Sequence, residues 1–189
     1  MQSTVHHLFD PMFRMFKIFL FTAFSFTLLS FSQCRQPVPA EKKEDANNYR
    51  ESLLKANQEA VRIEAEQIDD YIRRHRLDMM ETETGIRYQI YKPGIGANAQ
   101  TGFTVKLDYT LSLLTGDTVY SAAKDGPLTF MIGKGQVITG LEEAILLLRV
   151  GDRAKIIIPS HLAFGLIGDQ KKIHHKASLV YDLEFISMY

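Results

Sequence analysis

The feature that most constrains the fold is a strict two-residue alternation between positions 105 and 113. Val105, Leu107, Tyr109, Leu111 and Leu113 are apolar or aromatic, and the residues between them are polar. Successive side chains of a strand point to opposite faces, so this pattern predicts a strand with one buried face. That face is too apolar for water, and the sheet to which it belongs therefore needs a covering layer.

Other segments supply the remaining parts of such a domain. Strands are also expected at 86–90, 129–132, 153–158 and 179–186. The segment 140–148 is strongly helical, with Thr139 as the expected capping residue and Gly151 at the exit. Together they predict an α+β fold in which a curved antiparallel sheet wraps around one short helix. No internal repeat is visible.

The chain begins with a pattern typical of secretory signals. Arg14 and Lys17 precede the uncharged apolar stretch 18–31. That stretch is too short to span a bilayer core comfortably, and a basic segment before a short apolar one is typical of a signal peptide. Residues 1–33 are therefore predicted to be a signal peptide, whose natural start is Met12 or Met15.

Cys34, the single cysteine of the chain, lies three residues after the end of that stretch. Phe31-Ser-Gln-Cys34 resembles a bacterial lipobox, although Gln33 departs from the usual small residue. We predict lipidation at Cys34, a stalk over 34–48, and a membrane-anchored lipoprotein of the cell envelope that faces the periplasm. The alternatives are a cleaved signal with an incidental cysteine and an uncleaved anchor.

The next segment has the composition of a helix. Residues 41–78 contain no Gly or Pro, and we expect a helical linker over 49–82. A narrow apolar stripe runs along it, formed by Leu54, Val61, Ala65, Ile68 and Ile72. We interpret the helix as a spacer or as a segment lying against the domain. The alternative is weak dimerisation through residues 49–78.

Charge and histidine content argue against several functions. Lys+Arg and Asp+Glu both total 22, so there is no net basic charge to favour nucleic acid. His161, His174 and His175 have no carboxylate or cysteine at ligand spacing, so we expect a solvated loop and no metal. Asp152-Arg153 and Lys171-Lys172 are expected to be surface charges.

Five blocks follow one another in the second half of the chain: Val105–Thr110, Gly116–Ser121, Pro127–Glu143, Val150–Gly165 and Ala177–Phe185. Their order and spacing resemble the FK506-binding protein (FKBP) family of peptidyl-prolyl cis-trans isomerases over residues 84–189. The order of signal, stalk, helix and domain also resembles Bacteroidetes-like lipoproteins, including gliding-motility-associated isomerases. The resemblance implies an isomerase domain without cofactor or metal.

The reaction explains why the site of such an enzyme is apolar. Rotation about an Xaa-Pro bond costs ~18–20 kcal/mol because amide resonance is lost. A pocket of low polarity favours the twisted transition state over the planar ground state. The resemblance places these residues around the pocket, with Leu128 and Ile173 contacting substrate: Tyr109, Val119, Tyr120, Leu128, Phe130, Val137, Ile138, Leu141, Phe164, Ile173 and Tyr181. It also implies that the backbone N–H of Ile138 donates to a carbonyl of the ligand.

The sequence departs from the family pattern at several of these positions. Leu141 stands where the family has tryptophan, Tyr120 where it has aspartate, and Phe164 where it has tyrosine. Val119 and Leu128 stand where aromatic rings are common, and the loop 168–177 lacks the usual Ile-Pro-Pro run. We expect a pocket that holds its substrate less rigidly, low affinity for drug-type ligands and reduced turnover.

Three functions compete on this basis. The first is an isomerase acting on Xaa-Pro bonds of exported proteins, assisting envelope protein folding. The second is a catalytically weakened domain that binds proline-containing segments as a chaperone or adaptor. The third gives the working role to the helix, which would pair with another subunit or a membrane complex.

Overall fold

The structure, a computed structural model, describes residues 40–189. The predicted signal segment, Cys34 and the first part of the predicted stalk lie outside the described residues. The chain divides into two compact units, one ending at Glu51 and one spanning Ser52–Tyr189, which contains the sheet. Within residues 40–189, no helix is long and apolar enough to cross a membrane.

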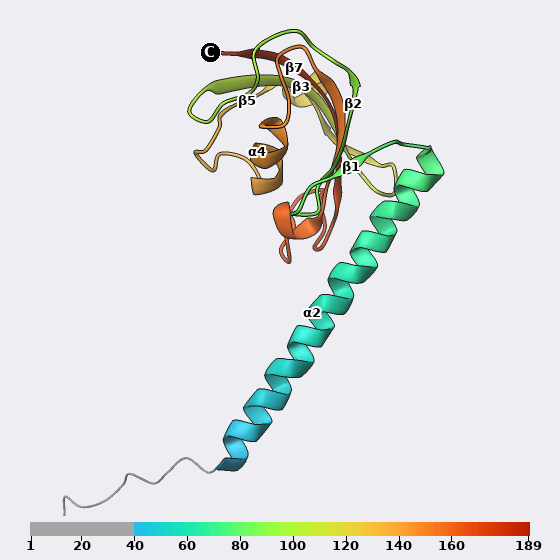
Figure 1. The fold of residues 1–189 in the computed structure, drawn as a ribbon, viewed down its shortest axis with the longest axis vertical. Helices are drawn as coiled ribbons and strands as arrows, with labels where there is room; N and C mark the ends of the chain where they lie inside the picture. The colour runs from blue at the N-terminus through green and yellow to red at the C-terminus, as the bar shows by residue number, and fades with distance from the viewer. Residues whose placement is uncertain (1–39) are drawn as a thin grey trace, which may run out of the picture. The chain divides into compact units, whose positions relative to one another are not determined.

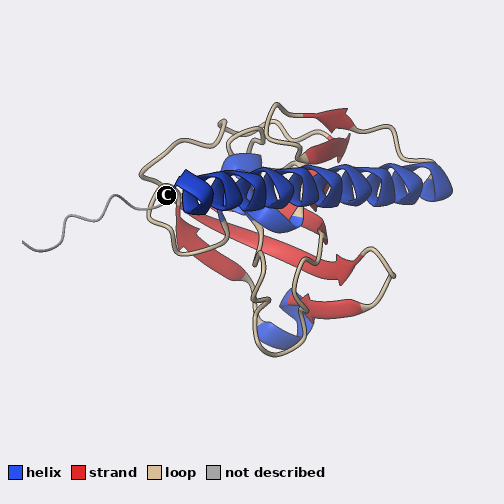
Figure 2. Cartoon of the chain, turned by 90° about the horizontal axis from the view of Figure 1, so that it is seen from below, coloured by secondary structure: helices blue, strands red, loops and turns tan. Residues whose placement is uncertain are grey.

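The elements are α2 (Ala40–His75), β1 (Met80–Glu81), β2 (Arg87–Lys92), β3 (Thr104–Leu113), β4 (Thr118–Ser121), α3 (Ala122–Asp125), β5 (Leu128–Met131), α4 (Thr139–Ile145), β6 (Arg153–Ile158), the 3₁₀ turn Ser160–Leu162 and β7 (Leu179–Met188). Strands and loops make up most of residues 80–189 (Figure 2). Every expected strand is present. The short strands β1 and β4 were not expected, because so few residues show too little alternation.

Within the described residues, seven strands form one antiparallel sheet in the order β1-β2-β6-β7-β3-β4, with β5 also paired to β3. β3 pairs with β4, β5 and β7 and so anchors that half of the sheet. Its residues Val105, Leu107, Leu111 and Leu113 are buried and Tyr109 is partly buried, as the alternation predicted. The sheet curves around α4 (Figure 1), which confirms the expected fold class.

Helix α4 packs closely on the sheet because its second residue is glycine. A Cβ on Gly140 would stand 2.4 Å from Cγ2 of Ile158 in β6, so no larger residue fits there without a shift. Leu141 and Ile145 are fully buried in the main core. The expectation that Thr139 caps the helix is wrong: Ile138 is the capping residue, and no side chain caps the first amides. The helix also ends three residues early, at Ile145.

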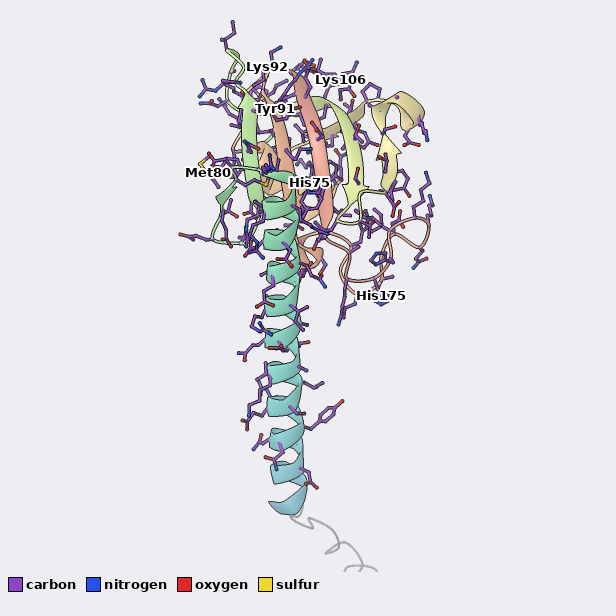
Figure 3. All side chains as sticks on the ribbon, turned by 90° about the vertical axis from the view of Figure 1, so that its right-hand side faces the viewer. His75, Met80, Tyr91, Lys92, Lys106 and His175 are labelled. Atoms are coloured by element: carbon purple, nitrogen blue, oxygen red, sulfur yellow. The ribbon has the colours of Figure 1, made fainter. Side chains whose placement is uncertain are left out.

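The C-terminal part of α2 covers the other face of the sheet. Ile68 and Tyr71 pack on Ile157 of β6 and Val180 of β7, and these four residues form a second buried cluster. The helix ends at His75, whose ring stacks on Tyr71 and which lies in front of the strands in Figure 3. The predicted apolar stripe is only partly a packing face.

The N-terminal members of that stripe, Leu54 and Val61, are exposed, whereas Ile68 is buried. Tyr71 was not part of the stripe, yet it is one of the buried contacts. Asp69 of α2 also forms an ion pair with the buried Arg87 of β2. Residues from the last turns of α2 therefore belong to the folded domain.

The expectation that Asp152 is a surface charge is wrong. Its side chain is buried, and its carboxylate accepts hydrogen bonds from the backbone N–H groups of Gly94 and Arg149 at 2.6 and 2.8 Å. The carboxylate thus fixes the turn before β6 against the loop after β2. A buried acceptor with two donors is satisfied, so the burial carries little penalty. Arg153 is exposed and pairs with Glu184.

Candidate active site

A pocket of about 390 Å³ lies between the sheet, α4 and two loops. Its wall residues are Tyr109, Leu111, Tyr120, Leu128, Gly135, Gln136, Val137, Ile138, Leu141, Phe164, Ile173 and Tyr181. Aromatic and aliphatic side chains predominate. Leu141 is fully buried and belongs both to the pocket wall and to the main core, which keeps that wall rigid.

The structure brings together all but two of the residues that the family resemblance placed in the pocket. Val119 and Phe130 instead lie in the core and do not contribute to the wall, because both side chains are buried among sheet residues. Leu111, Gly135 and Gln136 line the pocket although the sequence did not single them out. For Leu111 a signal existed, because it shares the apolar face of β3 with Tyr109.

The loop before α4 is held in place by side chains. Gln136 accepts a hydrogen bond from the backbone N–H of Met131 at 2.8 Å, and Glu142 of α4 accepts one from that of Gly135 at 2.9 Å. The carbonyl of Ile138 accepts from the N–H groups of Leu141 and Glu142, but its own N–H donates to no backbone carbonyl within residues 40–189. A donor at the pocket wall is thus available to a ligand carbonyl.

Two tyrosines stand together on the sheet side of the pocket. The ring centroids of Tyr109 and Tyr181 are 6.2 Å apart and tilted by 40°. Burial raises the pKa of Tyr181 well above its usual range, and burial followed by the charge of Asp125 raises that of Tyr109. Both phenols are neutral at physiological pH, so neither adds a charge to this side of the pocket.

Tyr120 and Asp169 join two sides of the pocket rim. The hydroxyl of Tyr120 donates to the carboxylate of Asp169 at 2.5 Å, and this bond, followed by burial, raises the pKa of Tyr120 to about 12. Burial by itself would raise the pKa of Asp169. Hydrogen bonds from Tyr120 and from the amides of Ile173, Lys171 and Lys172 outweigh it and lower that pKa to about 2. The pair is a phenol hydrogen-bonded to a carboxylate at neutral pH.

Lys172 adds a third contact at this place. Its ammonium donates to the carbonyl of Val119 at 2.9 Å and lies 4.6 Å from the ring centroid of Tyr120. Lys172 is exposed, as expected for a surface charge, and its head group also rests on the pocket rim. Asp169 and Lys172 were missed because their partners are about fifty residues away in the chain and no local pattern marks the contact.

The sequence profile described as FKBP-type peptidyl-prolyl cis-trans isomerase matches residues 96–186. The chain is 36% identical over 107 residues to FK506-binding protein 1A of Emericella nidulans, covering 55% of this chain and 98% of that protein. It is 35% identical over 115 residues to the chloroplastic peptidyl-prolyl cis-trans isomerase FKBP16-3 of Arabidopsis thaliana, covering 57% of this chain and 52% of that relative.

A solved structure shows the same fold over more of the chain. The crystal structure of FkpA from Escherichia coli superposes with a TM-score of 0.59 at 22% identity, covering 91% of this chain and 81% of that one. The chain belongs to the family of FKBP-type peptidyl-prolyl cis-trans isomerases. It spans only about half the length of the chloroplastic relative. The family expected from the sequence blocks is confirmed.

Proposed function

We propose that this protein catalyses the cis–trans isomerisation of Xaa-Pro bonds in exported proteins and so assists their folding in the cell envelope. The observation that carries the proposal is the pocket itself, in which apolar walls meet the backbone N–H of Ile138, a donor with no backbone acceptor within residues 40–189. The pocket accepts the proline ring, and the Ile138 N–H holds the substrate chain. No covalent step is required, because the barrier is a rotation.

The arrangement favours the transition state by its polarity. The twisted amide loses conjugation, and walls such as Leu141 and Phe164 offer it a less polar setting than water. Lowering the barrier by ~7–8 kcal/mol would accelerate the reaction by a factor of the order of 10⁵–10⁶. Uncatalysed prolyl isomerisation takes tens to hundreds of seconds, which is slow enough to limit folding.

The test is a protease-free isomerisation assay by NMR exchange on short Xaa-Pro peptides. We expect exchange to be accelerated by the wild-type chain and strongly reduced in Phe164→Ala. Ile138→Pro, which removes the donor, should also reduce it. Circular dichroism must show that both variants are folded. A folded wild-type chain that binds the peptides without accelerating exchange would overturn the proposal.

That last outcome would favour the second candidate, a domain that binds proline-containing segments as a chaperone or adaptor. Its support is the replacement of the family's tryptophan, aspartate and tyrosine by Leu141, Tyr120 and Phe164. Leu141→Trp is a direct test, because a gain in turnover would show that the natural pocket is impaired. Tyr120→Asp must be combined with Asp169→Asn, since two carboxylates would otherwise meet at the rim.

The proposed location in the cell envelope rests on the sequence of the N-terminal segment. A lipid anchor at Cys34 would hold the domain at a membrane, facing the periplasm, where exported chains emerge. Metabolic labelling with a radioactive fatty acid tests it. We expect label in the wild-type protein and none in Cys34→Ala, and label in neither would remove the anchor from the proposal.

Dimerisation through residues 49–78 remains an additional proposal. The exposed apolar residues Leu53, Leu54 and Val61 on α2 support it. Sedimentation of the wild-type chain and of a Leu54→Glu/Val61→Glu variant tests it, since a monomer in both cases would exclude this surface as a dimer contact.

A further inference from the structure

The segment between β6 and β7 contributes two residues to the pocket wall and has little regular secondary structure. Residues 160–178 contain one 3₁₀ turn, Ser160–Leu162, and otherwise form loops. Phe164 and Ile173 line the pocket from this segment, and Asp169 secures its middle to Tyr120. Because loops lack the regular hydrogen bonding of strands, the position of both walls depends on what fixes the ends of the segment.

A single carboxylate of α2 fixes both ends. Glu64 accepts hydrogen bonds from the N–H and the hydroxyl of Ser160, at 2.6 and 3.0 Å, and from the hydroxyl of Ser178 at 2.6 Å. Both serines are buried, with 7% and 5% of their surface exposed. Hydrogen bonds to an ionised acceptor are stronger than neutral ones, and buried donors cannot turn to water when the acceptor is lost.

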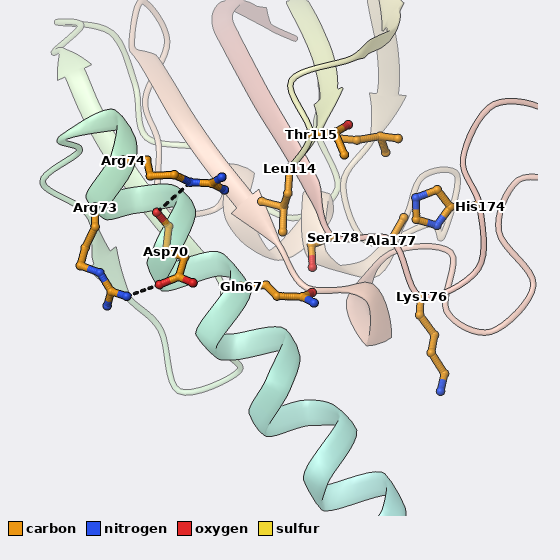
Figure 4. Close-up of a pocket in the computed structure, with 11 residues that line it drawn as sticks. Gln67, Asp70, Arg73, Arg74, Leu114, Thr115, His174, Lys176, Ala177 and Ser178 are labelled. Carbon is orange, nitrogen blue, oxygen red and sulfur yellow. Dashed lines mark hydrogen bonds and ion pairs between the residues drawn. The ribbon is translucent and has the colours of Figure 1, made fainter.

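The packing of α2 on the sheet fixes where the Glu64 carboxylate lies. Glu64, Ile68 and Tyr71 are spaced by four and three residues and so lie on one face of the helix. Ile68 and Tyr71 are buried against β6 and β7, which sets the distance between the helix and the sheet. Figure 4 shows Ser178 beside Gln67, the residue one turn after Glu64, where the start of β7 meets α2.

We propose that Glu64 is a positioning residue of the isomerase site, holding Phe164 and Ile173 at the pocket by joining the two ends of the segment that carries them. The proposal rests on the proposed isomerase function and assigns α2 a part in it. Glu64 is not among the residues that line the pocket. Its effect passes through the loop, so its removal should alter the site more than it alters the stability of the domain.

The test compares Glu64→Ala with two controls on the same helix. Glu66→Ala removes an exposed carboxylate two residues after Glu64, on the opposite face of the helix, whose ion-pair partner within residues 40–189 is Arg62. Ile68→Val removes one methyl group from the packing of α2 on the sheet, a change small enough to weaken the docking without displacing Glu64. For each variant, exchange catalysis is measured by NMR at a temperature where urea titration shows it fully folded. The binding of an Xaa-Pro peptide is measured under the same conditions.

We expect kcat/KM to fall on the order of tenfold in Glu64→Ala, because displaced walls misplace the substrate. Ser178→Ala should show a smaller loss, and combining it with Glu64→Ala should add little, since both remove the same contact. Glu64→Gln should recover part of the activity, because its amide oxygen still accepts from Ser160. Glu66→Ala and Ile68→Val should stay within about twofold of wild type.

Wild-type kcat/KM in folded Glu64→Ala overturns the proposal, as does an equal loss in Ile68→Val, which would mark a general effect of helix docking. Should the wild-type chain lack turnover, the proposed function fails separately. Peptide affinity then decides for Glu64: weaker binding in Glu64→Ala than in Glu66→Ala supports positioning, and equal binding refutes it.

Discussion

The two faces of the sheet differ in what covers them and in what they do. One face packs on α4 in an extended core that includes Leu141, Ile156 and Phe185, and the pocket opens at its edge. The other face packs on the last turns of α2 through a cluster of four buried residues. The first face holds the larger buried core and the pocket walls. The second supplies the attachment that places Glu64.

Two adjacent isoleucines of β6 lie on opposite faces of the sheet, so the same substitution at each position compares the two faces. Ile156 and Ile157 are both fully buried, but Ile156 lies in the main core and Ile157 lies under α2. We expect Ile156→Ala to lower the free energy of unfolding by about 3–4 kcal/mol and Ile157→Ala by about 2–3 kcal/mol. The second cost is smaller because α2 can shift toward the sheet and partly fill the cavity, whereas the enclosed main core cannot relax as far. Urea unfolding followed by circular dichroism measures both.

The same pair separates stability from activity. Ile156→Ala should also reduce isomerisation in the folded fraction, since the core it enlarges includes Leu141 of the pocket wall. If the two substitutions lowered the free energy of unfolding equally, or Ile157→Ala lowered it more, the α2 face would be at least as rigid as the α4 face.

The next prediction concerns the loop that joins the two faces. Phe164 lines the pocket, whereas Leu166, two residues on, is 75% exposed and lines no part of it. We expect Phe164→Ala to lower kcat/KM by about 10- to 100-fold, because the proline ring loses one of its walls, and Leu166→Ala to change it by less than about twofold. NMR exchange on the same peptide measures both, and similar losses would mean that the loop acts by general flexibility.

A smaller effect is expected at the rim. Tyr120→Phe removes the hydroxyl that donates to Asp169, and Asp169→Asn weakens the acceptor for that hydroxyl and for the amides of Ile173, Lys171 and Lys172. Each should lower kcat/KM by about three- to fivefold, and the double variant should lose little more than Asp169→Asn. Additive losses would show that the two side chains act independently.

The sequence predicted the α4 face well and the α2 face poorly. Alternation along β3 identified the buried face of the sheet, and the family blocks named most of the pocket wall, because these signals lie within short stretches of chain. Three consecutive isoleucines, Ile156 to Ile158, were a usable signal for the second face. A strand apolar on both sides is covered on both sides.

The contacts that fix the loop could not be predicted in this way. Glu64 meets Ser160 and Ser178 about a hundred residues further along, and Asp169 meets Tyr120 across 49 positions. A glutamate on a helix and two serines have no distinguishing pattern, since each is ordinary on a solvated surface. Only the docking of α2 through Ile68 and Tyr71 brings them together.

The smallest expected effect is the pH dependence of the rim contact. The pKa of Asp169 is lowered from 3.8 to about 2, so its contribution to folding is complete above about pH 4 and is lost as pH falls toward 2. We expect the difference in unfolding midpoint between wild type and Asp169→Asn to be constant from pH 7 to pH 5 and to shrink between pH 4 and pH 2.5. Other carboxylates titrate in both proteins and cancel in the difference. A difference that persists unchanged to pH 2.5 would show that Asp169 stays ionised there or adds no stability through its charge.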